Sequence, residues 1–145
     1  MNDRYLYRGK RIDTGEWVEG SLVTGVFFRL GQEIPYMFCP NLADYDCFED
    51  FSEENGIFEV DPSTICQCTG LKDKKGKLIW EHDIVTFAHE KCTRNYVIEF
   101  EKTFYNYGLR FRNKSTHFRC TQATLCTHDC EVIGNSIDNP ELLEV

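Results

Sequence analysis

Residues 69–87, TGLKDKKGKLIWEHDIVTF, constrain the fold more than any other part of the chain. Two polar corners, Asp73–Gly76 and Glu81–Asp83, alternate with two short apolar runs, Leu78–Trp80 and Ile84–Phe87. The second run is rich in β-branched and aromatic residues, which favour buried strands. The glycine that ends the first corner can adopt a positive φ without a Cβ clash. This pattern predicts short strands joined by tight turns, and it contains no catalytic constellation.

The rest of the chain extends the β pattern on both sides. Between residues 105 and 111 apolar and polar residues alternate strictly, which predicts a half-buried strand. The one helical signal is Asp61-Pro62, a capping residue followed by proline at the first helical position, with Gly70 as the expected end of the helix. We therefore expect a mostly β protein with minor helix. The strands expected are residues 5–9, 17–23, 26–30, 34–39, 56–60, 84–87, 96–100, 105–112 and 131–135.

Composition narrows the class of protein. The chain has 145 residues, which is enough for one domain with a genuine core. It contains no apolar run near the roughly 20 residues that a membrane span needs. Residues 1–10 lack the apolar segment of a signal peptide, so we expect a cytoplasmic protein whose eight cysteines are reduced. A disulfide framework is typical of short secreted chains instead.

Acidic residues are concentrated in one part of the sequence. From residue 30 to residue 71 there is no Lys or Arg, and the same window contains nine Asp and Glu. Within segment 40–55, aromatic residues are interspersed with the acids. Charge runs usually face solvent, and that remains the simpler interpretation. The alternative is a contact surface for a partner, formed by Asp44, Asp46, Phe48, Glu49, Asp50, Glu53 and Glu54.

Two other sites are open alternatives. A basic strand face could bind nucleic acid through Arg110, Arg112, Lys114 and Arg119, although the net charge of −8 opposes a general phosphate footprint. A structural zinc ion could be held by Cys126, His128 and Cys130, but the spacing departs from that of standard zinc ribbons and fingers. No histidine lies in a recognisable motif with a cysteine nucleophile. We therefore expect a non-enzymatic protein without a cofactor.

Five ordered groups of residues resemble the YopX family of small bacteriophage and prophage proteins. They are Tyr7–Lys10 with Gly15–Gly20, Val60–Thr64, Thr69–Asp73 with Gly76-Lys77, Ile79–Val85, and Val132–Asn135 with Asn139–Leu143. The resemblance implies an SH3-like barrel in the second half and an origin in a phage or prophage of a bacterium. It implies no activity and no functional residues.

The resemblance also implies one domain over residues 1–145. Within it we expect an N-terminal β lobe over about residues 1–60, and a lobe with the short helix and the barrel over about residues 61–145. The family usually has glycine where this chain has His82. A histidine there indicates either that the turn does not need a positive φ or that its backbone is strained.

These observations together predict an accessory protein that acts by binding another macromolecule. The partner is an unidentified protein or a second copy of the chain, because barrel edges and surplus aromatic residues favour self-association. Nucleic acid is the second class of partner, and no membrane contact is expected.

Overall fold

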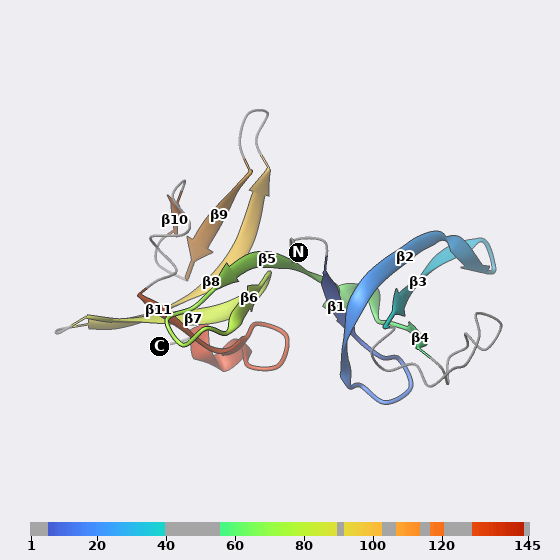
Figure 1. Cartoon of the computed structure of the whole chain (residues 1–145), viewed down its shortest axis with the longest axis horizontal. Helices are drawn as coiled ribbons and strands as arrows, with labels where there is room; N and C mark the ends of the chain where they lie inside the picture. Colours follow the sequence, from blue (N-terminus) through green and yellow to red (C-terminus); the bar gives the residue numbers. More distant parts are fainter. Residues whose placement is uncertain are drawn as a thin grey trace. The chain divides into compact units, whose positions relative to one another are not determined.

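The computed structural model describes residues 6–39, 56–89, 92–102, 107–113, 117–120 and 129–143. The chain divides into two compact units, Met1–Gln67 (unit 1) and Cys68–Val145 (unit 2). The strands are antiparallel and lie in two sheets, so the expected mostly β fold is confirmed (Figure 1). No helix in the described part of the chain is long and apolar enough to span a membrane.

Unit 1 is built on two hairpins. Strands β1 (Tyr7–Lys10) and β2 (Trp17–Arg29) form the first hairpin, and β2 forms the second with β3 (Gln32–Phe38). The short strand β4 (Ile57–Glu59) pairs with the end of β3. The sheet continues from β1 to β5 (Cys66–Lys72), whose first two residues pair with β1. The core of unit 1 consists of Val18, Met37, Cys39, Phe58 and Val60.

The prediction of a helix from Asp61 to Gly70 is wrong beyond the first turn. The Asp61 carboxylate does cap, since it accepts a hydrogen bond from the Ser63 backbone N–H at 3.0 Å. The helix is the single 3-10 turn η4 (Pro62–Thr64), and the chain is extended from Ile65 onward. Cys66 and Cys68 are both fully buried, two residues apart on one face of β5. This period-two burial gives the segment the pattern of a strand, and pairing with β1 outweighs the local helical signal.

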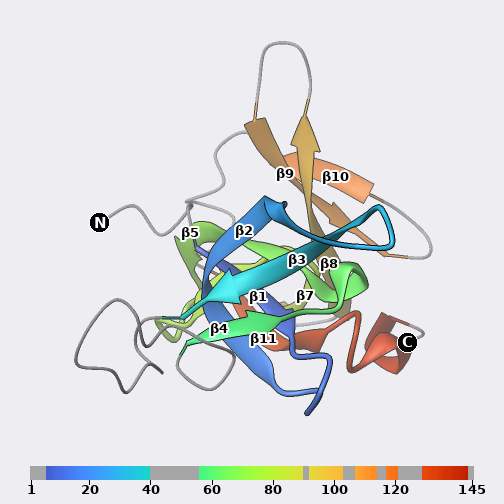
Figure 2. The same cartoon turned by 90° about the vertical axis from the view of Figure 1, so that its right-hand side faces the viewer.

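Unit 2 contains a five-stranded antiparallel sheet in the order β10-β9-β8-β7-β11 (Figure 2). Its strands are β7 (Asp83–His89), β8 (Cys92–Lys102), β9 (Tyr107–Arg112), β10 (His117–Cys120) and β11 (Cys130–Asn135). The remaining elements are β6 (Leu78–Trp80), which pairs with β5, and the 3-10 turn η5 (Pro140–Leu143). The Asn95 side chain donates to the Leu142 carbonyl at 2.9 Å and so attaches η5 to β8.

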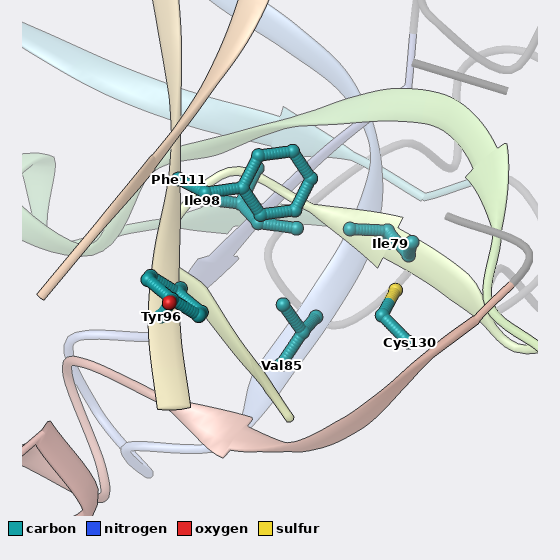
Figure 3. Packing of buried hydrophobic residues seen from close by; sticks show 6 residues of the cluster. All are labelled: Ile79, Val85, Tyr96, Ile98, Phe111 and Cys130. Atoms are coloured by element: carbon teal, nitrogen blue, oxygen red, sulfur yellow. The ribbon is translucent and has the colours of Figure 1, made fainter. Parts of the chain in front are cut away.

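One face of this sheet carries the core of unit 2. Its buried side chains come from five different strands and are Ile79, Val85, Tyr96, Ile98, Phe111 and Cys130 (Figure 3). Phe111 is fully buried, whereas its neighbours Arg110 and Arg112 are not, as the alternation in the sequence predicts. Burial of each large side chain contributes about 2 kcal/mol to folding. Among the described strands no pairing closes the sheet into a barrel, so the SH3-like barrel is not confirmed.

Candidate functional site

The turn at the end of the β2–β3 hairpin has an unusual residue at its first position. Leu30 and Gly31 connect the strands, with φ angles of 53° and 80°. Positive φ at both central residues is the pattern of a type I′ turn, which favours Asn-Gly, Asp-Gly or Gly-Gly. A leucine in the left-handed region is strained, because its Cβ crowds the backbone. The strands expected at residues 26–30 and 34–39 are therefore joined by the two-residue turn Leu30-Gly31 and not by residues 31–33.

A bulge separates this end of the hairpin from its base. The β2–β3 register shifts between Val23 and Phe27, and Gly25 within the bulge has a φ of 75°. The Gly25 N–H donates to the Glu33 carboxylate across the hairpin. Pro35 lies opposite the bulge, where its missing N–H interrupts no ladder hydrogen bond. The two strands expected at residues 17–23 and 26–30 are therefore one strand, β2, that contains this bulge.

Beyond the bulge the hairpin is a two-stranded ribbon. Strand β1 pairs with β2 only through residues 17–20, and β4 pairs with β3 only through residues 36–38. Residues 24–34 therefore extend past the ends of both flanking strands (Figures 1 and 2). An isolated two-stranded ribbon is marginally stable in water. A covering partner would stabilise it.

The ribbon exposes apolar side chains to solvent. Leu30 is 100% exposed, Val26 is 64% exposed and Phe28 is 62% exposed. Phe27 is 38% exposed and contacts the ring of Tyr36, with the ring centroids 4.3 Å apart. Of the six exposed large apolar residues in the described chain, only Ile133 lies outside unit 1. We call Val26, Phe27, Phe28 and Leu30 the hairpin patch.

A groove lies beside one face of the ribbon. It has a volume of about 260 Å³, and its apolar lining residues are Ile12, Leu30, Ile34, Pro35, Val60 and Pro62. Phe27 and Ile34 are cross-strand partners, as are Arg29 and Gln32, so these four side chains share the groove face. At its rim the Arg29 guanidinium pairs with the Glu59 carboxylate at 3.2 Å. Phe28 and its partner Glu33 lie on the opposite face of the ribbon.

Unit 1 carries the entire net charge of the protein. Residues 1–67 contain five Lys and Arg and thirteen Asp and Glu, whereas residues 68–145 contain eleven of each kind. The net charge of −8 therefore belongs to the unit that bears the hairpin patch. An apolar patch on a strongly anionic unit favours cationic partners with apolar side chains.

Comparison with known protein families identifies the family of this chain. The family model described as YopX protein matches residues 6–144, which is nearly the whole sequence. The chain belongs to the YopX family. No curated protein matches this YopX chain.

The acidic segment predicted as a contact surface in this YopX protein lies outside the described residues, as do all seven of its candidate residues. The described residues that flank it lie close together, because the Cys39 N–H donates to the Gly56 carbonyl at 2.7 Å. The segment falls within unit 1, between β3 and β4 in the sequence. Its six carboxylates add to the negative charge of that unit.

The basic strand face of the YopX chain is partly neutralised. Arg110 and Arg112 both donate through Nε and Nη2 to the carboxylate of Glu99, with Nη2–O distances of 2.5 and 2.7 Å. Burial raises the pKa of Glu99, but the two guanidiniums lower it by more, so the carboxylate stays ionised. Arg119 is the cross-strand neighbour of Arg110 in β10, while Lys114 lies outside the described residues. The strand brings the two arginines together as predicted, and Glu99 forms ion pairs with both.

The proposed zinc ligands are not brought together in the described part of the YopX chain. Cys126 and His128 lie outside it, and Cys130 is fully buried in the core of unit 2 with its thiol directed toward Ile79 (Figure 3). Burial raises the pKa of Cys130 to about 11, so its thiol is neutral near pH 7. No group of three His, Cys, Asp or Glu among the described residues is arranged to hold a metal.

The sequence analysis did not identify the hairpin patch. One signal was present: Val26-Phe27-Phe28 are three consecutive apolar residues in a strand, so at least one points to each face of the sheet. Such a run needs cover on both faces, or it remains exposed. The residues that would supply this cover cannot be read from the sequence, because they depend on where β1 and β4 end.

Proposed function

We propose that this YopX protein is a non-enzymatic accessory protein of a phage or prophage that binds another protein through the hairpin patch of unit 1. The observation that carries the proposal is the exposure of four apolar side chains at the end of a ribbon with a strained turn. Large exposed apolar patches on soluble proteins mark interaction sites. The proposal does not depend on whether unit 2 closes into an SH3-like barrel.

The energetics of Leu30 support this proposal. A non-glycine residue in the left-handed region costs on the order of 1–3 kcal/mol, and such strain clusters at functional positions. The exposed Leu30 side chain gains no packing energy in return. Burial of a leucine side chain against a partner would contribute about 2 kcal/mol, which is of the size needed to offset the strain.

The acidic segment 40–55 is a second part of the proposed contact surface. It lies between β3 and β4 in the sequence, and its charge has the same sign as the rest of unit 1. Carboxylates around an apolar patch are expected to speed the encounter with a cationic partner and to set its orientation. The apolar side chains would provide most of the affinity.

The test is a comparison of variants in a pull-down from bacterial lysate treated with nuclease. The test variant is Val26→Lys with Phe28→Lys, which changes two exposed side chains of the patch. The control is Ile133→Lys, which introduces the same charge at an exposed apolar residue of unit 2. We expect a protein partner that is retained by the wild type and the control and lost from the test variant. Equal recovery with all three proteins would reject the hairpin patch as the binding site.

The other functions weighed from the sequence gain no support from the described residues. Glu99 accepts from Nε and Nη2 of both Arg110 and Arg112, and its charge weakens the attraction of that face for phosphate. For a zinc-stabilised role, only Cys130 of the three candidate ligands is described, and it lies in the core of unit 2. Self-association remains a proposal, and sedimentation of the wild type over a range of concentrations tests it.

A further inference from the structure

One edge of β2 lacks a strand partner in the part of the chain that the structure describes. Strand β1 pairs with β2 up to Gly20, and from Ser21 to Arg29 the ladder with β3 lies on the other side. The edge of β2 that faces away from β3 therefore presents backbone N–H and C=O groups over nine residues. A row of such groups is a template for pairing with another extended chain.

This edge has few of the features that normally prevent pairing. Residues 21–28 include neither a charged residue nor a proline, and Arg29 at the end of the strand already pairs with Glu59. Natural edge strands are usually protected by Lys, Pro, short length or a bulge. Only the bulge is present here, between Val23 and Phe27. No described strand pairs with this edge on either side of the bulge, at residues 21–23 and 27–28.

Charge determines which chain could occupy the edge. Unit 1 carries a net charge of −8, so a second copy would bring an equal negative charge to the contact. A cationic segment would be attracted to the same surface, and carboxylates are present on both faces of the ribbon. Glu33 lies on the face of Phe28, and Glu59 lies at the rim of the groove. The charge distribution therefore favours a basic protein segment over self-pairing.

The side chains of the ribbon specify the pattern of that segment. Successive residues of an added strand point to opposite faces, so they would meet Phe27 on one side and Phe28 on the other. We infer that the free edge of β2 binds an extended segment of a partner protein, with alternating apolar residues and with Lys or Arg as its charged residues. This inference rests on the proposed function and specifies the chemistry of the partner.

The test is selection from a random library of peptides about twelve residues long displayed on phage. The library is selected on the full-length wild-type protein and depleted on the Val26→Lys, Phe28→Lys variant. We expect enriched peptides with apolar residues at every second position and an excess of Lys and Arg. Apolar residues at helical spacing, an acidic consensus, or no enrichment over the variant would overturn the inference.

The best synthetic peptide then tests backbone pairing and charge separately. Methylation of its alternate backbone nitrogens, on the edge that would pair, should weaken binding at least tenfold, whereas methylation of the opposite edge should change it little. A rise in NaCl from about 50 to about 300 mM should also weaken binding severalfold, since screening reduces the attraction of exposed charges. Equal effects of the two methylated peptides, or an affinity that does not depend on salt, would contradict the inference.

Two further outcomes separate this inference from the proposed function. If a cellular partner depends on the hairpin patch but is not displaced by the selected peptide, the proposed function is supported and the inference about the β2 edge is rejected. A wild-type dimer that the Val26→Lys, Phe28→Lys variant dissolves would overturn the inference in favour of a second copy. The Ile133→Lys variant should bind the peptide as tightly as the wild type does.

Discussion

Two residues with positive φ behave differently in this protein. His82 has a φ of 70°, and its backbone is held on both sides: its N–H donates to Ile98 and its carbonyl accepts from Ser136, at 2.7 and 2.8 Å. Leu30 has a φ of 53° and a fully exposed side chain. The fold imposes the conformation of His82, so of the two interpretations of the departure from glycine, backbone strain is confirmed. The Leu30 side chain is fully exposed, so packing within the described protein does not require a leucine at this position.

We expect the Leu30→Asn substitution to stabilise the protein and to weaken partner binding. Asparagine followed by glycine is a preferred type I′ pair, so the free energy of unfolding should rise by about 1 kcal/mol. The loss of the exposed leucine should reduce binding of the partner at the same time. Urea unfolding and the pull-down measure the two effects. A variant that is more stable and binds normally would show that Leu30 takes no part in recognition.

The His82→Gly substitution should stabilise unit 2 without any effect on the hairpin patch. Glycine adopts a positive φ without the Cβ clash, and we expect a gain of about 1 kcal/mol in the free energy of unfolding. Equilibrium unfolding in urea measures it. This variant also serves as the control for Leu30→Asn, because it relieves strain in the other unit. A loss of stability would mean that the imidazole makes a contact worth more than the strain.

The buried thiols should resist alkylation in the folded protein. Burial raises the pKa of both Cys39 and Cys130 to about 11, and the thiolate is the reactive form. At about pH 8 we expect iodoacetamide to modify these two cysteines far more slowly in the native protein than in urea. Mass spectrometry of proteolytic peptides measures the rate at each site. Rapid modification of native Cys130 would indicate that the core of unit 2 opens easily.

At the scale of elements, a single carboxylate organises the corner between β5 and β6. The Asp73 side chain accepts from the N–H groups of Lys75 and Lys77 through Oδ1 and from that of Val132 through Oδ2, each at 2.9 Å. It therefore closes the turn and attaches it to β11. Asp73 is 6% exposed, so loss of these acceptors would leave backbone donors poorly solvated.

Asp73 should make stability dependent on pH. Burial raises its pKa, but the three N–H donors lower it by more, so the folded pKa lies below the usual value of 3.8. The unfolded chain then binds the proton more readily, and the stabilisation is lost as the pH falls below about 4. Asp73→Asn should cost about 2 kcal/mol near pH 7, because the amide N–H₂ would face the Val132 N–H. Urea unfolding at several pH values between about 3 and 7 should show a weaker pH dependence for the variant than for the wild type, and equal slopes would exclude Asp73 as a source.

Most of the strands were predicted from the sequence, but β5 was expected to be a helix and β10 was not predicted. The residues at which neighbouring strands stop pairing were not predicted either. Alternation over residues 105–112 placed Phe111 inside and Arg110 and Arg112 outside, because period-two burial depends only on local geometry. The helix expected to end at Gly70 was wrong because pairing with β1 is a long-range effect. The hairpin patch was missed for a related reason. Its exposure depends on β1 and β4 ending before the ribbon does, which no local pattern encodes.

At the scale of the whole molecule, the division of charge matches the division of the chain. All of the net charge of −8 lies in unit 1, and unit 2 is formally neutral. The sequence revealed the acidic window, but the boundary at Gln67 came from the structure. Both candidate contact surfaces, the hairpin patch and the segment 40–55, belong to the acidic unit. Recognition is therefore proposed for unit 1, and unit 2 contributes the five-stranded sheet.

The position of the unit boundary has a consequence for how such genes can be rearranged. Domains are commonly joined by exposed linkers, and recombination between genes can exchange them there. In this chain the boundary falls inside β5, between Gln67, which pairs with β1, and Cys68, which pairs with β6. A crossover at that point would divide a buried strand and leave each unit with an incomplete ladder. We expect the two units to be inherited together, and the family match over residues 6–144 spans both of them.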